Sequence, residues 1–382
     1  MSYDPEALIA RHFLRETENG VASPNERAIL RLIWRNPGIS RSEITAHVDL
    51  TQQSVYRIID QLTERGMLLL GAPKPGRGQP SPTLRPNGAF AYSVGISVNT
   101  DIIGICLIDM AGSVLAQSTV PLAGEPMGQS LDRVHEHVTE QRRKLGLTRE
   151  AWLGVGFAIA GYHVGGTRYN APLPLHEWSL IELGPLLAER FGKPVWVHNG
   201  ANTGAIAEAM FGAGRHVRHL AYLSFNYGFG GGLIHEGELL LGGNGNAGEF
   251  SGIYDEEENK RRPALQYLIE RLRENGVDVP SISYMRQHFE ANWPGVAQWV
   301  DEVTPAYIRL INAIYAIFDP QAIVFGGQVP PDLAHMLIAR TRIFGSPRYG
   351  VPRPFPKLIV SEIKGDASAL GAAVAPFKAV LY

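Results

Sequence analysis

The chain has 382 residues, of which 45% are hydrophobic and 19% charged, and its formal net charge is −2. This balance gives no global sign of a nucleic-acid or membrane partner, and the apolar fraction is sufficient for more than one buried core. A single cysteine, Cys106, excludes an internal disulfide and a cysteine-rich zinc site. The N-terminal segment is too charged for a signal peptide, and no apolar run reaches membrane-helix length. We therefore expect a soluble, cytoplasmic protein without a membrane partner.

The first 85 residues carry a modest excess of positive charge and the pattern of three short helices. Residues 25–85 contain nine basic and five acidic residues. Capping boxes at residues 23–26 and 40–43 start two helices, and Thr51 can cap a third one that Gly66 ends. The apolar residues of this third helix fall on one face. They are Val55, Ile58, Ile59 and Leu62.

The third helix and the segment after it predict a surface that binds double-stranded DNA. A β-prone stub at residues 67–70 leads into a loop, GAPKPGRGQPSPTL, with two positive charges and no negative one. Three helices and a basic hairpin describe a winged helix-turn-helix, here residues 23–86, whose third helix enters the major groove. The alternative is a small helical domain with a solvated polar face. The expected DNA-binding residues are Arg41, Ser42, Thr51, Gln52, Gln53, Ser54, Tyr56, Arg57, Lys74, Arg77 and Gln79.

From residue 89 onward, strands alternate with helices. Two blocks, each with a β-hairpin followed by helices, predict an α/β fold of two lobes, the actin-like (ribonuclease H-like) ATPase-type architecture. We place lobe one at about 89–205 plus the C-terminal helix and lobe two at about 206–360, and expect residues 1–22 to form a helical extension. The expected strands are 92–98, 102–109, 113–120, 153–158, 195–197, 222–225, 232–234, 322–325 and 357–360.

The stretch VWVHNGAN, residues 195–202, places polar groups where such folds build ligand sites. The carboxyl end of a strand here faces the start of a helix, a position that commonly binds ligands in open α/β sheets. His198 and Asn199 are polar, but Gly200 has no side chain. No carboxylate for chemistry therefore follows this strand directly.

Taken together, these segments resemble the ROK family, which unites bacterial sugar kinases with sugar-responsive transcriptional repressors. The resemblance covers nearly the whole chain. It implies a repressor that binds a palindromic operator as a homodimer or a dimer of dimers, with a cleft for a sugar-like effector. The segments that carry it are NERAILRLIWRNPGISRSEITAHVDLTQQSVYRIIDQLTERG, GRGQPSPTL, VWVHNGAN, YLSFNYGFGGGLIHEGELLLGGNGNAGE, FDPQAIVFGGQV and GDASALGAA.

Three departures from the family pattern argue against kinase activity. Family kinases have an Asp-x-Gly-Gly-Thr phosphate loop where residues 97–101 read SVNTD, and a Gly-Thr-Gly loop where residues 226–228 read NYG. The catalytic aspartate of their Asn-Asp-Ala-Asn string falls at Gly200 here. His198 cannot simply replace it, because neighbouring strand residues point to opposite faces. We therefore expect no catalytic residue.

The ligand-binding positions of the family are partly retained, whereas its metal-binding positions are not. Asn199 and Glu249 match residues that hydrogen-bond sugar hydroxyls, and Asn170 and His198 are further candidates, although Asn170 is out of register. For His198 the alternative is a packed histidine, and a bulkier ligand could instead use His176 or Arg168. The histidine and cysteines of the family's zinc site are missing, so no metal or cofactor is expected, and DEEENKRRPA is interpreted as an exposed loop.

Two other functions stay open at this point. One is a sugar kinase with an atypical catalytic base, which ATP turnover would reveal. The other is a regulator that needs no ligand, which the eroded sugar site suggests. A screen of monosaccharides, amino sugars and polyols would separate it from an effector-controlled repressor.

Overall fold

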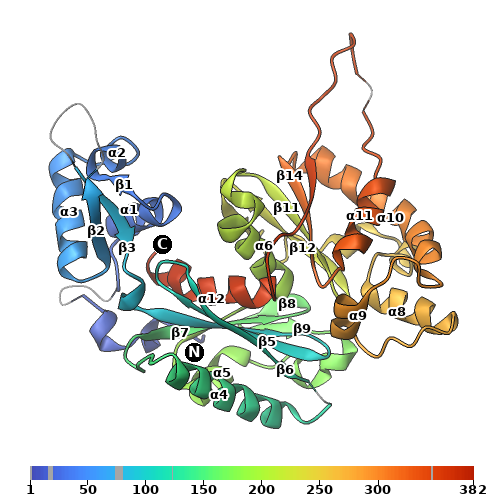
Figure 1. The fold of residues 1–382 in the computed structure, drawn as a ribbon, viewed down its shortest axis with the longest axis horizontal. Helices are drawn as coiled ribbons and strands as arrows, with labels where there is room; N and C mark the ends of the chain where they lie inside the picture. The colour runs from blue at the N-terminus through green and yellow to red at the C-terminus, as the bar shows by residue number, and fades with distance from the viewer. Residues whose placement is uncertain (1, 16–19, 74–80, 123, 346) are drawn as a thin grey trace.

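The computed structural model describes residues 2–15, 20–73, 81–122, 124–345 and 347–382. A small domain lies at one end of the long axis, and a larger domain with two lobes makes up the rest (Figure 1). Each lobe contains a five-stranded sheet, and helices α6 (Gly200–Phe211) and α12 (Ala367–Val380) pack against both sheets. In the described chain, no helix combines the length and the apolar character that crossing a bilayer requires.

The N-terminal domain has the three helices that its capping residues predict. At Ser23 and Ser40, the serine Oγ accepts the N–H of the glutamate three residues on, and that glutamate accepts the serine N–H in return. Thr51 caps the third helix by accepting the Ser54 N–H. The strands pair antiparallel in the order β1-β3-β2. The bounds are α1 Pro24–Arg35, β1 Ile39–Ser40, α2 Arg41–Thr45, α3 Gln52–Glu64, β2 Leu68–Pro73 and β3 Pro82–Pro86.

In the described part of the first 22 residues, the predicted helical extension is limited to short turns. Their described part contains two single turns of 3-10 helix, Glu6–Leu8 and Arg11–Phe13. Ile9, Phe13 and Val21 are nevertheless buried in the same hydrophobic cluster as the N-terminal domain. Helices shorter than about 12–15 residues are marginal on their own. Tertiary packing therefore sets the path of this segment, rather than helix propensity.

Lobe one contains the sheet β10-β7-β4-β5-β6. Strands β4, β5 and β6 are antiparallel, while β7 and β10 run parallel to β4. Helices α4 and α5 cover one face, and α12 lies on the other (Figure 1). The bounds are β4 Tyr92–Val98, β5 Ile102–Asp109, β6 Val114–Pro121, α4 Met127–Lys144, β7 Trp152–Ile159, β8 Tyr162–Gly165, β9 Arg168–Asn170, α5 Leu183–Phe191 and β10 Val195–Asn199.

Lobe two repeats this connectivity in the sheet β13-β12-β11-β14-β15. The antiparallel strands β11, β12 and β13 come first, and β14 and β15 follow parallel to β11. Because of the repeat, the β4–β5 and β11–β12 loops are equivalent, and both face the space between the lobes. The bounds are β11 Leu220–Phe225, β12 Phe229–His235, β13 Glu238–Leu240, α7 Glu256–Asn259, α8 Leu265–Glu274, α9 Ile282–His288, α10 Val296–Ile317, β14 Ala322–Gly327, α11 Pro331–Arg340 and β15 Lys357–Val360.

Helices α6 and α12 approach each other and the first sheet so closely that glycine is required at the contacts. A Cβ on Gly371 would lie 1.7 Å from the Thr203 carbonyl oxygen, and a Cβ on Gly156 would lie 1.7 Å from the Ala372 carbonyl oxygen. Both helices contact both sheets. The lobe boundary that we expect near residue 205 consequently falls inside α6 and not in a linker.

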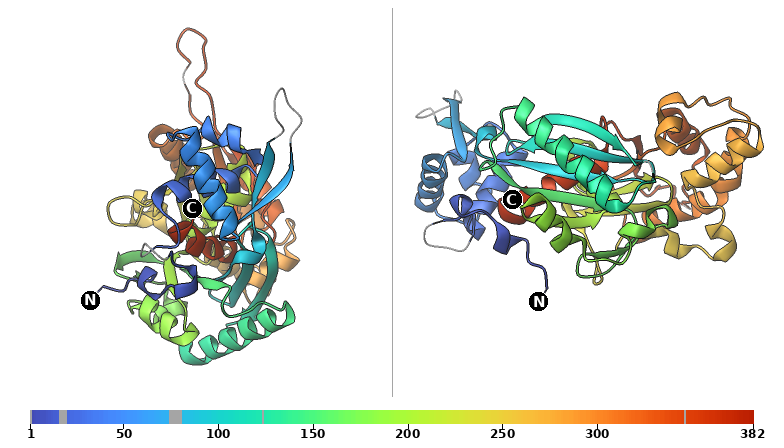
Figure 2. Two further views of the ribbon diagram at one scale, coloured as in Figure 1. Left: turned by 90° about the vertical axis from the view of Figure 1, so that its left-hand side faces the viewer. Right: turned by 90° about the horizontal axis from the view of Figure 1, so that it is seen from below.

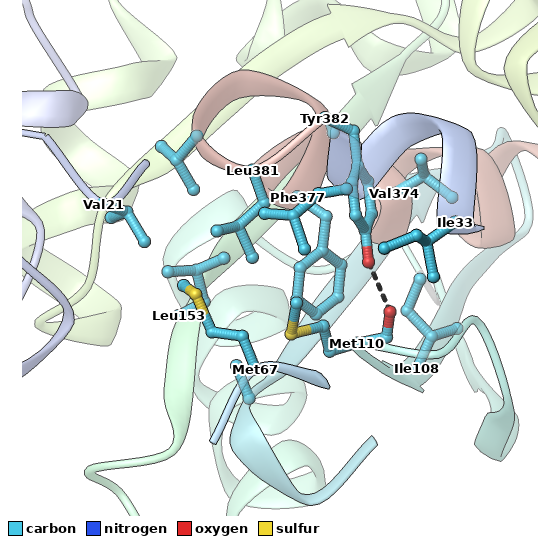
Figure 3. Packing of buried hydrophobic residues seen from close by; sticks show 14 of the residues in the cluster. Val21, Ile33, Met67, Ile108, Met110, Leu153, Val374, Phe377, Leu381 and Tyr382 are labelled. Carbon is cyan, nitrogen blue, oxygen red and sulfur yellow. Dashed lines mark hydrogen bonds between the residues drawn. The ribbon is translucent and has the colours of Figure 1, made fainter. Parts of the chain in front are cut away.

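The N-terminal domain shares one hydrophobic cluster with lobe one and with the C-terminus (Figure 3). Ile33 of α1 and Met67 belong to it, together with Met110 from the turn after β5. Leu381 and Tyr382 contribute from the end of the chain, and the Tyr382 hydroxyl donates a hydrogen bond to the Met110 carbonyl. The two domains are therefore joined by a packed core and not only by the chain between them.

A long segment leaves lobe two between α11 and β15 (Figures 1 and 2). In its described residues, 341–345 and 347–356, the chain turns at Tyr349 and Gly350, which both have positive φ. Arg353 anchors the segment by donating to the Tyr315 carbonyl. The segment projects beyond both sheets and belongs to neither.

Candidate functional site

The exposed face of α3 is the first candidate site. Gln53 and Arg57 are exposed on this helix, opposite the buried residues Val55 and Ile59, as the helical periodicity requires. Within the described chain, neither Gln53 nor Arg57 forms a hydrogen bond or an ion pair. Their donor and acceptor groups are therefore available for a base edge or a phosphate.

Other predicted DNA-binding residues are engaged within the domain. Arg41 forms an ion pair with Asp60, and its guanidinium lies 5.4 Å from the Tyr56 ring centroid. Gln52 donates to the Tyr56 hydroxyl at 3.2 Å. The contacts of Arg41 fix α2 against α3. The hydroxyls of Ser42, Thr51 and Ser54 meet other hydroxyls at the helix starts, whereas Lys74, Arg77 and Gln79 lie outside the described residues.

A cavity of about 420 Å³ between the lobes is the second candidate site. The β4–β5 loop, the β11–β12 loop and the start of α6 all open onto it. Its volume falls within the range of small-molecule sites. Of the four residues expected to contact a ligand, Asn170, Asn199 and Glu249 line this cavity, and His198 is not part of the described lining.

Asn199 ends β10 and caps α6. Its Oδ1 accepts the N–H groups of Ala201 and Asn202 at 2.7 and 3.2 Å. Its Nδ2 donates to the Gly161 carbonyl at 2.8 Å and to Glu249 Oε1 at 3.3 Å. All the hydrogen-bonding capacity of this amide is therefore used within the protein. A ligand hydroxyl can reach Asn199 only by replacing one of these contacts, and the longest is the one to Glu249.

Glu249 and Asn226 offer free acceptors to a ligand. Glu249 faces the cavity, and desolvation by the surrounding protein raises the pKa of its carboxyl. The Asn226 Nδ2 donates to Ser224, but its Oδ1 is buried without a partner among the described residues. An unpaired buried acceptor costs about 1–3 kcal/mol, which a ligand donor would recover. The sequence gives no signal for this role, because residues 226–228 stand out only as an altered phosphate loop.

His198 lies beside Asn199 but faces a different environment. Desolvation, with the charge of Lys378 adding to it, lowers the pKa of the His198 imidazole from 6.5 to about 4. Neighbouring residues of a strand point to opposite faces, which explains why Asn199 lines the cavity and His198 does not. An imidazole directed away from the cavity cannot act as a base within it.

Asn170 and two further candidates occupy the edge of lobe one. Asn170 lines the cavity and donates to the Tyr162 hydroxyl at 2.6 Å. His176 contacts the Leu173 carbonyl at 3.3 Å, and Arg168 forms an ion pair with Glu182. Neither His176 nor Arg168 belongs to the described cavity lining. The structure therefore groups Asn170, but not the other two, with Asn199 and Glu249.

The β4–β5 loop brings a carboxylate to the cavity. Asp101 in lobe one accepts the N–H of Ser283 at 2.8 Å, at the start of α9 in lobe two. This hydrogen bond connects the two lobes across the cavity. Tyr227 lines the same space from the equivalent β11–β12 loop. A ligand phosphate in this part of the cavity would meet the negative charge of Asp101.

The segment DEEENKRRPA is exposed at most of its charged residues, as its composition suggests, but it is not entirely a loop. Asp255 and Glu258 form a capping box that starts the short helix α7. Glu258 pairs with Arg309 on α10, and Arg262 donates to the Tyr267 hydroxyl. Local capping and an ion pair therefore order the segment. In the described part of the chain, no three His, Cys, Asp or Glu side chains are grouped so that they could hold a metal ion.

Helices α6 and α12 connect the cavity with the N-terminal domain. Both start at the cavity, where the Ser368 hydroxyl donates to the Gly200 carbonyl at 2.8 Å. Both also lead to Trp34 on α1, since the ring centroids of Phe211 and Tyr382 lie 5.8 and 5.7 Å from that of Trp34. A relative shift of the two helix starts would reach α1 through closely packed side chains.

Part of the positive charge of the N-terminal domain faces the lobes. Arg27 and Arg31 of α1 donate to the carbonyls of Lys378 and Tyr382, at 2.9 and 2.7 Å. Arg35 forms an ion pair with Glu238 of lobe two at 3.0 Å. The basic excess counted along residues 25–85 therefore includes three arginines that hold the domains together.

Comparison with known proteins identifies both domains. Residues 23–68 match the winged helix-turn-helix DNA-binding family, and residues 93–261 match the ROK family. The fold and the exposed face of α3 thus define a DNA-binding protein with a two-lobed, actin-like domain. The chain thus carries a ROK family domain, preceded by an N-terminal winged helix-turn-helix. The fold class predicted from the sequence is confirmed.

Individual relatives include both regulators and kinases. The chain is similar to the xylose repressor of Caldicellulosiruptor bescii, with 27% identity over 307 residues that cover 76% of this chain and 73% of the repressor. A solved ROK family transcriptional regulator, a homolog of the Escherichia coli MLC protein, matches with a TM-score of 0.66 and 18% identity over 94% of this chain and 96% of its own. A ROK family glucokinase from Streptomyces griseus matches with a TM-score of 0.56 and 19% identity, over 75% and 99%.

Proposed function

We propose that the protein is a sequence-specific transcriptional regulator, a repressor of an operon for carbohydrate metabolism, whose interlobe cavity binds a sugar-like effector. The observation that carries this proposal is the connection of that cavity with α1 through α6 and α12. The resemblance to a xylose repressor supports the carbohydrate connection. Two copies would bind a palindromic operator as a homodimer or a dimer of dimers, each placing α3 in the major groove.

In this proposal an effector acts by changing the balance between two lobe arrangements. The arrangement that binds the effector more tightly becomes more populated, and its α6 and α12 ends place α1 differently. Since α1 packs against α3 in the same cluster, the spacing of two recognition helices would change with it. Operator affinity would then depend on the effector concentration.

The proposal assigns no kinase activity to the chain. Gly200 starts α6 without a side chain that could accept a proton, and His198 lies outside the cavity lining and is a weak base, since its pKa is lowered to about 4. Losing a positioned base typically lowers the rate by about 10²–10⁴. A Cβ at residue 200 would make only ordinary contacts, the nearest at 3.7 Å. The variant Gly200→Asp, which restores a carboxylate at this position, is therefore a practical control in an assay of ATP consumption. Hexose-dependent ATP consumption by the wild-type protein would contradict this assignment and favour an atypical kinase.

The proposal is tested by selecting DNA fragments that the full-length protein binds from its own genome. Their affinity is then measured by fluorescence anisotropy with and without a panel of sugars. We expect specific binding that at least one sugar changes. A sugar at one hundred times its Kd should also stabilise the fold by about 2.7 kcal/mol. Specific DNA binding without any sugar effect would favour the ligand-independent regulator.

A further inference from the structure

Acidic side chains outnumber available cationic ones in the interlobe cavity. Asp101 enters the lining from lobe one and Glu249 from lobe two. Arg262 is the one cationic side chain in the described lining, and its Nη1 donates to the carbonyl and the side chain of Asn259 and to the Tyr267 hydroxyl. The guanidinium is therefore already satisfied in part by lobe two. A ligand anion would meet two carboxylates and one engaged arginine.

The helix starts around the cavity are also occupied by the chain's own side chains. Asn199 accepts the first N–H groups of α6, and Asp366 accepts the N–H groups of Ser368 and Ala369 at the start of α12. Asp101 accepts the Ser283 N–H in α9. Free backbone N–H groups at helix starts are the usual phosphate-binding groups of α/β folds. Here side chains accept two of these N–H groups at α6 and two at α12, and the Asp101 carboxylate accepts one at α9.

Two acceptors remain for a ligand. The Asn226 Oδ1 is buried and unpaired within the described chain, and in the described residues the only side-chain hydrogen bond to Glu249 comes from Asn199. Both are acceptors, and sugar hydroxyls are donors that suit them. Tyr162 and Tyr227 add aromatic surface to the lining. An aromatic ring can cover the C–H face of a sugar, as aromatic side chains do for other apolar surfaces.

We infer that the cavity selects an unphosphorylated sugar or polyol and rejects the phosphate ester of the same sugar. This inference rests on the proposed function, because it takes the cavity as the effector site. A phosphate group would lose its hydration and meet the charges of Asp101 and Glu249, and the described lining of the cavity holds no cation apart from the engaged Arg262. A neutral sugar carries no charge whose hydration is lost when it enters the cavity. Its hydroxyl groups can donate hydrogen bonds to the Asn226 Oδ1 and to Glu249.

The test uses matched pairs of probes with the full-length protein. Isothermal titration compares glucose with glucose 6-phosphate, and N-acetylglucosamine with its 6-phosphate. Thermal shift adds xylose, arabinose and common polyols. We expect at least one unphosphorylated sugar to bind, and the phosphate ester of any paired binder to bind at least about tenfold more weakly. A phosphate ester that binds as tightly as its parent sugar overturns the inference, as does a panel in which no unphosphorylated sugar binds.

A variant of Asp101 identifies the source of the selectivity. Asp101→Asn keeps an oxygen acceptor for the Ser283 N–H but removes the charge, so the preference for the neutral sugar should narrow several-fold. Asp332→Asn, at an exposed carboxylate on α11, is the matched control and should leave the preference unchanged. If Asp101→Asn prefers the neutral sugar over its phosphate ester as strongly as the wild type does, Asp101 is not the source of the selectivity.

The two proposals fail separately in this design. A protein that releases its operator with a sugar phosphate, and not with the free sugar, overturns the inference while the proposed function stands. A protein that binds the free sugar but binds no DNA sequence selectively overturns the proposed function, while the inference about the cavity stands.

Discussion

Arg57 is the exposed basic side chain of α3 that is best placed to contact DNA. It forms no hydrogen bond or ion pair in the described chain. We expect Arg57→Ala to weaken operator binding by about 1–3 kcal/mol if it contacts a base pair, with relaxed specificity at that position. Anisotropy titrations measure the change, and Arg143→Ala, at an exposed arginine on α4, is the control. Equal operator affinities of wild type and Arg57→Ala would show that the recognition face is wrongly assigned.

His198 gives a pH dependence whose sign follows from its environment. Its pKa falls from 6.5 to about 4 on folding, so the unfolded chain binds a proton in this window that the folded chain does not. The free energy of unfolding should therefore decrease as the pH falls from 6.5 toward 4, by up to about 1.4 kcal/mol per unit from this residue. Urea denaturation of wild type and His198→Gln on both sides of pH 6.5 measures it. The stability difference between the two should change with pH, and a constant difference would contradict the assignment.

Predictions about single residues are correct where contacts with close neighbours in the sequence determine the local structure. The capping boxes at Ser23 and Ser40 and the polar face of α3 depend on neighbours within four positions, and the structure has them as expected. Asn226 could not be found in this way. Its free Oδ1 results from the arrangement of the β11–β12 loop within lobe two, and no spacing in the sequence encodes that arrangement.

At the level of elements, the α6–α12 contact decides how the lobes are joined. Gly371 of α12 lies against the Thr203 carbonyl of α6, where a Cβ would be 1.7 Å from the oxygen. Alanine favours a helix by about 1 kcal/mol over glycine, but the clash should exceed this. We expect Gly371→Ala to destabilise the protein by about 1–3 kcal/mol, measured by urea denaturation. Gly252→Ala, where a Cβ meets nothing within 4 Å, serves as the control, and equal stability of both variants would refute the close contact.

Element prediction succeeds where a segment has its own periodicity. The nine strands that we expect in the two lobes lie close to their predicted positions, because apolar alternation recurs along them, whereas the short strands β8, β9 and β13 were not predicted. Two segments differ from their predictions, since the described part of the N-terminal extension has only 3-10 turns and the predicted exposed loop contains the short helix α7. In the first case packing overrides an apparent helix, and in the second a capping box and the Glu258–Arg309 pair order a stretch that looks like a solvated loop.

Across the whole molecule, Trp34 stands where the two interlobe helices meet the DNA-binding domain. We expect Trp34→Leu, which keeps an apolar side chain but loses the ring contacts with Phe211 and Tyr382, to bind operator while responding less to the effector. The ratio of operator affinities with and without the effector is the measurement. Trp293→Leu, in lobe two, is the matched control. A full response in Trp34→Leu would exclude this route of coupling.

The domain arrangement could be predicted from the sequence only in outline. The order of a DNA-binding domain and two lobes follows from the pattern of elements, but the shared core between them does not. Arg27, Arg31 and Arg35 look like part of a DNA-binding charge excess, whereas the structure places them against the C-terminus and lobe two. Long-range contacts of this kind depend on both domains being folded.

The most direct measurement is a titration of the full-length protein into labelled DNA fragments from its own genome at several salt concentrations. We predict tight binding to one or a few palindromic fragments, with an affinity that falls linearly on logarithmic axes as salt increases, and far weaker binding to scrambled controls. Equal binding to selected and scrambled fragments at every salt concentration would contradict the assignment of this chain as a DNA-binding regulator.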